Sequence, residues 1–478
     1  MLFNSLEFGV FIPIVFILYW FVFNKSVKLQ NVFVLFASYV FYGWWDWRFL
    51  ILIAVSSFVD FSVGQALNRT DDAQRRKYLL WVSLSVNLGL LGFFKYFNFF
   101  LDSFRTAFTF LGHSFDGPNL HIILPIGISF YTLQTLSYTI DVYRKNLKAT
   151  NDIIAFFSFV SFFPQLVAGP IERATSLLPQ MLSLRTFNEQ AARDGTRQIL
   201  WGLFKKIVIA DNCAAYTYLL LIGDPGDTSG STALLATCLG AIQFYCDFSG
   251  YSDIAIGTAR LFGFKLMKNF AFPFFSRDIA EFWTRWHISL ISWIKDYVVK
   301  SIGGITRKTA VRNIFIVFIL TGLWHGAKWS FILWGFLQFL FFLPYLLRRK
   351  RVRKGRIVAK DKYLPSIKEV YQMISTFLLF ALSGLLFFTE SISKAIEIFL
   401  HIVLNKSTLT IPEIPSRTVM LSILILLIVE WLQREKEHGL EHIERLVPRP
   451  VRWISYYLLI GAIAYYGGDQ QPFIYFQF

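Results

Sequence analysis

The sequence predicts an all-α polytopic membrane protein. Its composition, the length of its apolar runs and the placement of its basic residues all point to that fold class. Of its 478 residues, 55% are hydrophobic and only 16% are charged, whereas a typical soluble domain carries ~25% charged residues. Such a composition excludes an intrinsically disordered chain. The 3 cysteines lie in apolar runs, which excludes a disulfide-stapled secreted scaffold.

The apolar runs are long enough to cross a bilayer, which takes ~20 residues of helix. We expect about 11 to 12 spans, in a single integral-membrane domain that covers residues 1–478. The expected spans are residues 8–24, 30–46, 48–66, 79–99, 121–140, 207–222, 231–248, 313–326, 328–347, 369–388, 418–432 and 453–467.

The lysines and arginines give a formal net charge of +16, which raises the question of a nucleic-acid partner. They lie in short clusters between apolar runs, as the positive-inside rule describes, so we expect contact with membrane lipids and no nucleic acid. The loops 101–119 and 223–230 are poor in basic residues and are expected outside, together with both termini. The stretches expected in the cytoplasm are 69–77, 144–148, 173–206, 260–312, 348–356 and 434–452.

Two segments do not fit a regular span. Residues 153–168 are apolar but lie between basic loops, and Pro164 interrupts them. They predict a re-entrant hairpin that is buried in protein or lines a cavity, with an ordinary span as the alternative. Residues 276–300 carry apolar side chains at i, i+3, i+4 and i+7 spacing, which predicts one amphipathic helix in the interface or beside the spans.

His325 is the first candidate for chemistry, in the sequence TGLWHGAKWSFILWG (Thr321 to Gly335). The apolar run before it has ~12 residues and would extend ~18 Å, less than the ~30 Å hydrocarbon core. The imidazole is therefore expected at membrane depth, where an ionisable residue is a functional candidate and could act as a general base. Trp324 and Trp329 flank it. The alternatives are a structural histidine hydrogen-bonded between helices and an interfacial turn with a belt of tryptophans.

His287 is the second candidate, in FWTRWHISLISWIKDY (Phe282 to Tyr297). On the predicted amphipathic helix it flanks the apolar stripe and could reach inward. The alternative is an interfacial anchor beside tryptophan.

Two further polar groups are candidates for the wall of a substrate tunnel. The sequence DFSGYSDIAIG, residues 247–257, directly follows an apolar span. Its alternative role is a helix end in the cytoplasmic interface. The sequence QLVAGPIER, residues 165–173, closes the predicted hairpin, and its alternative is a plain turn with a surface ion pair. The candidate side chains are Asp247, Ser249, Tyr251, Ser252, Asp253, Gln165, Glu172 and Arg173, with Trp324 beside His325.

Signatures of soluble enzymes are missing from the sequence. It has no G-x-S-x-G elbow, no Gly-rich phosphate loop and no H-E-x-x-H. His438 and His442 are four residues apart but lie in a charged loop without supporting ligands, so we expect no metal site.

The four sequences QLVAGPIER, DFSGYSDIAIG, FWTRWHISLISWIKDY and WHGAKWSFILWG occur in this order. In that combination the chain resembles the membrane-bound O-acyltransferase (MBOAT) superfamily. It is most similar to the bacterial branch that contains membrane subunits of alginate and peptidoglycan O-acetylation, and more distantly to the exporter of D-alanyl groups to teichoic acid. The similar region extends from about Phe94 to Gly335, and the closing FIYFQF (Phe473 to Phe478) also looks like that branch.

The resemblance implies a ring of tilted helices with re-entrant and amphipathic helices around a central tunnel. It implies that His325 is catalytic and that His287 is the second polar residue of the tunnel. It implies an acyl-CoA donor, acetyl-CoA, that enters from the cytoplasm, and no bound cofactor. The acceptor would be an extracytoplasmic polysaccharide, reached through a separate transferase subunit, and the protein would lie in the bacterial inner membrane.

A transporter or export component of a surface-glycan system, without covalent chemistry, is the competing class. Such proteins also carry polar residues at the membrane midplane and are often built from repeats. The hydropathy of this chain has no evident repeat, which weighs against that class.

Overall fold

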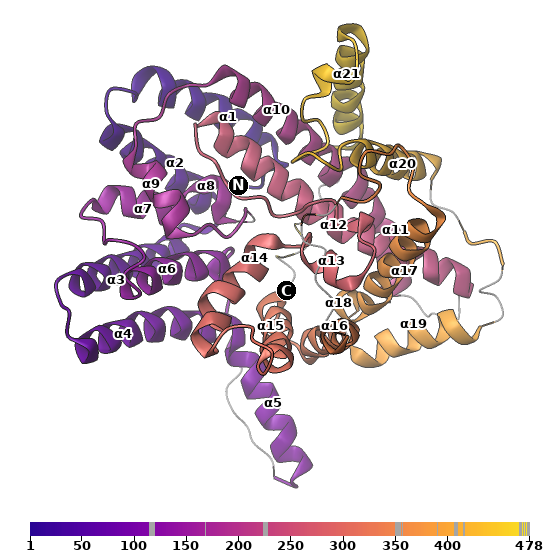
Figure 1. Ribbon diagram of the computed structural model, residues 1–478, viewed down its shortest axis with the longest axis horizontal. Coiled ribbons are helices and arrows are strands. Elements are labelled where there is room, and N and C mark those ends of the chain that lie inside the picture. Colours follow the sequence, from indigo (N-terminus) through magenta and orange to yellow (C-terminus); the bar gives the residue numbers. More distant parts are fainter. Residues whose placement is uncertain are drawn as a thin grey trace. The chain divides into compact units, whose positions relative to one another are not determined.

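The computed structural model describes residues 1–113, 120–167, 169–222, 228–348, 355, 357–389, 391–405, 410–413, 416–467, 471, 473 and 475. Within those ranges every regular element is a helix, as the composition predicts (Figure 1). The chain divides into two compact units. The first unit comprises Met1–Asn188, Leu261–Leu266 and Gly326–Lys328, and the second comprises Glu189–Arg260, Met267–His325 and Trp329–Phe478.

Some helices of the first unit begin at a capping side chain. Ser26 and Asp72 accept hydrogen bonds from main-chain N–H groups of the first turn of α2 and α4, which otherwise lack partners. The helices are α1 (Leu6–Ile17), α2 (Val27–Asp46), α3 (Leu50–Asn68), α4 (Ala73–Leu91), α5 (Phe97–Phe110), α6 (Ile128–Tyr143), α7 (Ile153–Ser161), α8 (Phe163–Leu166) and α9 (Ala174–Leu182).

A buried polar cluster joins α3, α4 and α6, which lie side by side (Figure 1). Asp60 of α3 accepts hydrogen bonds from Ser83, from Asn87 Nδ2 at 2.8 Å and from Thr139 Oγ1 at 2.8 Å. Asn87 Oδ1 in turn accepts from Ser56 at 2.7 Å. Because buried polar groups are costly without partners, this cluster specifies how the three helices pack.

The segment 153–167 is broken and largely buried, which agrees with the predicted interruption, whereas its position in a membrane stays a prediction. Its helices α7 and α8 are separated at Phe162, and the side chains around the break are fully enclosed. Gln134 Nε2 of α6 donates to the Phe159 carbonyl at 2.5 Å, and Gln165 Nε2 donates to the same carbonyl at 3.0 Å. Side-chain amides therefore satisfy a carbonyl that the broken helix exposes, which is how irregular backbone is tolerated inside a membrane protein.

The second unit contains the longest helix, α12, which α10 crosses at close range. A Cβ atom on Gly202 would lie 2.6 Å from the Gly250 carbonyl oxygen, and one on Gly195 would lie 2.6 Å from that of Gly257. The helices are α10 (Glu189–Leu203), α11 (Asp211–Ile222), α12 (Gly230–Leu261), α13 (Ile279–Trp283), α14 (Ile288–Trp293), α15 (Ala310–His325), α16 (Trp329–Leu347), α17 (Ile367–Ser383), α18 (Leu385–Phe388), α19 (Ile392–Leu404), α20 (Arg417–Leu432) and α21 (Arg449–Tyr466).

By length and apolar composition alone, 4 helical segments in the described ranges are able to cross a membrane. They are Val27–Asn68, Ala73–Phe110, Trp329–Leu347 and Ile367–Phe388; Leu6–Val22, Ile153–Leu166 and Ala310–His325 are apolar but shorter. The expected total of about 11 to 12 spans stays a prediction.

The predicted amphipathic helix over residues 276–300 is wrong. The chain forms α13, turns at residues 284–287 and then forms α14, with a short π-helix at Ile294–Val299. The reason is buried charge. Glu281 is fully enclosed and pairs with Arg277 at 3.0 Å and with Arg285 at 2.7 Å, so the presumed polar face packs inside the protein.

Three other boundaries differ from the prediction. The loop expected at 101–119 is helical to Phe110 in α5, and the expected span 121–140 becomes helical only at Ile128. The span expected to end at residue 248 continues as α12 to Leu261. The stretches 114–119, 223–227, 349–354 and 476–478, with Arg356 and Ile474, lie outside the described residues. They include most of the basic run 348–356 and of the acidic loop 223–230.

Candidate functional site

His325 is the last residue of α15, and α16 begins at Trp329, so the chain turns where the sequence predicted. The 16 residues of α15 extend ~24 Å, still less than a ~30 Å hydrocarbon core. The imidazole is 1% exposed. Of the two flanking tryptophans, Trp324 is buried whereas Trp329 is 59% exposed, so only Trp324 belongs to the enclosed site.

Aromatic rings surround His325. Its ring centroid lies 5.2 Å from that of Trp324, 5.4 Å from Trp334, 5.0 Å from Phe387 and 5.5 Å from Tyr475. Rings at these distances keep water away, and a water-poor surrounding strengthens every electrostatic interaction inside it.

His287 lies close to His325. The two imidazole centroids are 6.3 Å apart, and Trp324 is a neighbour of both, 5.1 Å from His287. Phe248 of α12 closes another side of His287 at 4.7 Å. The expected position on a helix wheel is wrong, because His287 occupies the turn before α14. The two histidines are nevertheless near enough for both to reach one reacting group.

The C-terminal segment contributes a residue that reasoning from single residues missed. Tyr475 lies 5.5 Å from His325, 5.7 Å from Trp324 and 4.6 Å from Phe248, measured between ring centroids. Phe473, two residues earlier, lies 4.3 Å from Tyr251. The structure describes Phe473 and Tyr475 of FIYFQF, and the density of aromatic residues in that sequence was a signal that these two side chains are packed.

The acidic residues of DFSGYSDIAIG lie well inside α12, so the alternative of a helix end in the interface is wrong. Asp253 pairs with Lys205 Nζ at 2.6 Å, and Ser249 Oγ accepts from the same nitrogen at 2.8 Å. Asp247 pairs with Lys206 Nζ at 2.8 Å.

Both lysines lie in a π-helix, Phe204–Ala210, between α10 and α11. Lys206 also pairs with Asp211 at 2.8 Å and lies 5.6 Å from the Tyr251 ring centroid. Both lysines fall in the stretch 173–206 that was expected in the cytoplasm, and that placement stays a prediction. They are not exposed loop residues, because both are enclosed and paired with carboxylates of α12 and α11. Buried charges in a membrane protein require such partners.

The other tunnel candidates divide between the units. Ser252 of α12 accepts a hydrogen bond from Asn269 Nδ2 at 3.0 Å, within the second unit. Gln165, Glu172 and Arg173 belong to the first unit. Glu172 is only 1% exposed, so the alternative of a surface ion pair does not hold.

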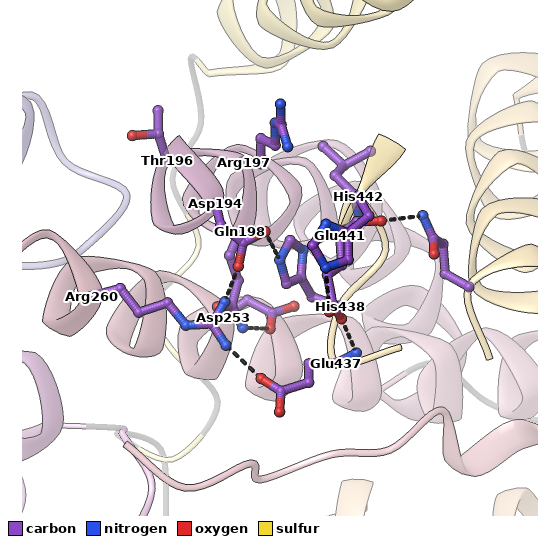
Figure 2. Close-up of polar contacts among 12 residues, drawn as sticks. Asp194, Thr196, Arg197, Gln198, Asp253, Arg260, Glu437, His438, Glu441 and His442 are labelled. Atoms are coloured by element: carbon purple, nitrogen blue, oxygen red, sulfur yellow. Dashed lines mark hydrogen bonds and ion pairs between the residues drawn. The ribbon is translucent and has the colours of Figure 1, made fainter. Parts of the chain in front are cut away.

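A cluster of charged residues links α10, α12 and the loop after α20 (Figure 2). His438 Nε2 is 3.1 Å from Asp194 Oδ1, and Arg260 binds both Asp194 and Glu437, the latter at 2.6 Å. Partial burial alone would raise the pKa of Asp194, but His438 and the nearby arginines lower it on balance. Among the residues that the structure describes, no group of three or more His, Cys, Asp or Glu could hold a metal ion.

The helices and the site together define an all-helical, multi-pass membrane protein with two enclosed histidines in an aromatic surround. The chain belongs to the MBOAT, membrane-bound O-acyltransferase family, whose pattern it matches over residues 128–389. This stretch overlaps the expected core of 94–335 and contains both histidines.

The chain is similar to curated relatives from several bacteria. It is 41% identical over 334 residues to the probable alginate O-acetylase AlgI of Azotobacter vinelandii, covering 68% of this chain and 64% of that protein. It is 35% identical over 371 residues to the peptidoglycan O-acetyltransferase of Helicobacter pylori, covering 71% and 69%. It is 29% identical over 262 residues to the teichoic acid D-alanyltransferase of Bacillus subtilis, covering 52% and 64%. The match thus spans less than two thirds of the length of the Azotobacter protein.

Proposed function

We propose that this protein is an O-acyltransferase that moves an acetyl group from cytoplasmic acetyl-CoA to a hydroxyl acceptor, for O-acetylation of an extracytoplasmic polysaccharide. The observation that carries the proposal is the enclosed pair His325 and His287, with ring centroids 6.3 Å apart. The relatives are named as enzymes that acetylate alginate and peptidoglycan, which supports acyl transfer to an extracytoplasmic polymer. Alginate-like polymers and peptidoglycan are both candidate acceptors.

In the proposed reaction His325 is the general base. It takes the proton from the acceptor hydroxyl while the oxygen attacks the thioester carbonyl carbon, so a C–O bond forms and the C–S bond breaks. His325 then gives the proton to the leaving thiolate, and no net proton is produced. A positioned base contributes ~10²–10⁴-fold to such a reaction.

His287 orients the acyl carbonyl in this proposal. A hydrogen-bond donor placed where negative charge develops stabilises the transition state more than the ground state. The rings of Trp324, Trp334, Phe387 and Tyr475 restrict the access of water, which would otherwise hydrolyse the thioester. Asp247 and Asp253 hold α12 in place through the lysine pairs and take no part in proton transfer.

The proposed location is the bacterial inner membrane, with the donor on the cytoplasmic side. The acceptor hydroxyl belongs to the polysaccharide or to a separate extracytoplasmic transferase subunit that completes the transfer. No bound cofactor is needed, because the donor thioester supplies the leaving group.

The test is thioester cleavage by purified protein supplied with radiolabelled acetyl-CoA and an extract of the cell-surface polymer. We expect His325→Ala to lower acetyl transfer by at least ~10²-fold, with unchanged helical content by circular dichroism. His121→Ala is the matched control, because His121 is exposed in the first unit. Full transfer activity in His325→Ala would refute the assignment. Uptake of an intact solute without thioester cleavage would favour the export role instead.

A further inference from the structure

The backbone at His287 has an unusual conformation. Its φ is 42° and its ψ is 51°, in the left-handed region. Residues with a Cβ atom reach this region at a cost, since Cβ crowds the following carbonyl oxygen. Such a conformation persists only where the surroundings hold it, and it is found preferentially at functional sites.

Asn269 supplies contacts that hold this turn. Its main-chain carbonyl accepts from the N–H of Ile288 at 2.9 Å, directly after His287. Its side-chain Oδ1 accepts from Ser289 Oγ at 2.9 Å and from the Ser289 N–H at 3.4 Å. One asparagine thus binds the two residues that follow the histidine.

The same segment also binds the residues before the histidine. The N–H of Ala271 donates to the Arg285 carbonyl at 3.0 Å, and an Arg285 side-chain nitrogen donates to the Ala271 carbonyl at 3.3 Å. Residues 269–271 therefore lie along the turn and are bonded to it on both sides of His287.

The amide nitrogen of Asn269 connects the turn at His287 to α12. Nδ2 donates to Ser252 Oγ at 3.0 Å, and Asn269 is completely enclosed. An asparagine is the side chain of this size that offers an acceptor and a donor at once. Aspartate keeps the acceptors but has no N–H to donate, and leucine has neither.

We propose that Asn269 is a positioning residue for His287: its amide fixes the left-handed turn and ties it to Ser252 of α12. The expected effect of Asn269 on the reaction rate rests on the proposed function, in which His287 orients the acyl group. The expected effect of Asn269 on the position of the His287 side chain does not depend on that function. Without Asn269, the turn relaxes toward ordinary backbone angles, and the imidazole of His287 moves away from its place beside Trp324.

The kinetic test compares Asn269→Ala, Asn269→Leu and Asn269→Asp in the full-length protein. Misplacement of a reacting group by ~1 Å can cost ~10²-fold in rate, so we expect kcat to fall ~10- to 100-fold in the Ala and Leu variants. KM for acetyl-CoA changes less than kcat, because the contact between His287 and the acyl carbonyl strengthens as negative charge develops in the transition state. Asn269→Asp retains more activity than either, since its carboxylate still accepts from Ser289 and the Ser252 hydroxyl can turn to donate.

The matched control is Asn31→Ala. Asn31 is also completely enclosed, and its Nδ2 donates to the Met181 carbonyl at 2.8 Å within the first unit. This variant carries a comparable loss of a buried amide, so its kcat per folded molecule should equal that of the unmodified protein.

A second measurement does not depend on activity. Diethylpyrocarbonate modifies accessible imidazoles, and mass spectrometry reads the rate at each histidine. We expect Asn269→Ala to raise the modification rate at His287 at least ~5-fold, with the rate at the exposed His121 unchanged. If His287 reactivity and kcat both equal those of the unmodified protein, the positioning role is refuted. If the reactivity rises in a protein that never cleaves acetyl-CoA, the positioning role stands and the proposed function fails.

Discussion

Asp60 in the first unit and Asp247 in the second unit are buried carboxylates that are stabilised in different ways. In the first unit, Asp60 accepts hydrogen bonds from Ser83, Asn87 and Thr139, which are all uncharged. In the second unit, Lys206 neutralises two carboxylates, those of Asp211 and Asp247. When the donors are neutral and separate, removing one of them costs one hydrogen bond and leaves the others in place. A shared lysine couples three charges, so losing it leaves two negative charges without a partner.

The largest effect is therefore expected from Lys206→Met. Removing one partner of a buried ion pair costs ~3–5 kcal/mol, and here two carboxylates are left behind. We expect the free energy of unfolding, measured by SDS titration in mixed micelles, to fall by at least that range. Adding Asp247→Asn to Lys206→Met should recover part of the loss. If Lys206→Met is as stable as the unmodified protein, the contrast between the units does not hold.

A smaller loss is expected from Asp60→Ala in the first unit. It removes the acceptor of three donors, but Asn87 Nδ2 also donates to the Ser83 carbonyl at 3.0 Å, and the hydroxyls of Ser83 and Thr139 can turn to main-chain carbonyls. We therefore expect a loss equal to about one unsatisfied buried donor, ~1–3 kcal/mol. In the same SDS titration, Asp60→Asn should lose less than Asp60→Ala because its amide oxygen still accepts. A loss from Asp60→Ala larger than that from Lys206→Met would reverse the comparison.

The smallest effect is expected at Asp194, which is partly exposed between His438 and Arg260. The folded state lowers the pKa of this carboxyl. Its stabilising contribution is thus present above the unfolded pKa of ~4 and is lost as the pH falls through the folded value. We expect Asp194→Asn to lower the melting temperature at pH 7, and the difference from the unmodified protein to shrink below pH ~4.

The control for that pH series is Arg193→Ala, which removes an exposed pair with Glu189. Such pairs contribute ~0–1 kcal/mol, so its melting temperature should differ little at either pH. If Asp194→Asn lowers the melting temperature equally at both pH values, packing and not charge stabilises this cluster.

The fold class and the turn of the chain at His325 could be predicted from the sequence. Long apolar runs indicate which segments are helices of a membrane protein. Counting the apolar residues before His325 shows that the helix ending there is shorter than a full membrane span. The broken helix at 162 was also predictable, because Pro164 and basic flanks conflict with a regular span.

The partners of the charged residues could not be predicted. Lys205 and Lys206 have the same local pattern as the basic residues of a cytoplasmic loop, and only the long-range contact with α12 shows that they are enclosed. The break at His287 was missed for a related reason. The helical periodicity of residues 276–300 shows which residues are apolar. It does not show that Glu281 and Arg285 form an ion pair and are therefore buried on the side that was expected to be polar. Asn269 gave no signal, because its partners lie 17 to 20 residues away along the chain.

The glycine contacts between α10 and α12 determine how far one helix is shifted along the axis of the other. Gly195 meets Gly257 and Gly202 meets Gly250, and each pair is two helical turns from the other. Sliding α10 by one turn would drive larger side chains into main-chain atoms at both crossings. Uncharged glycines thus determine that Lys205 lies opposite Asp253. A bulky substitution at Gly202 would shift α10 along α12 and separate this ion pair, although every ionisable side chain would still be present.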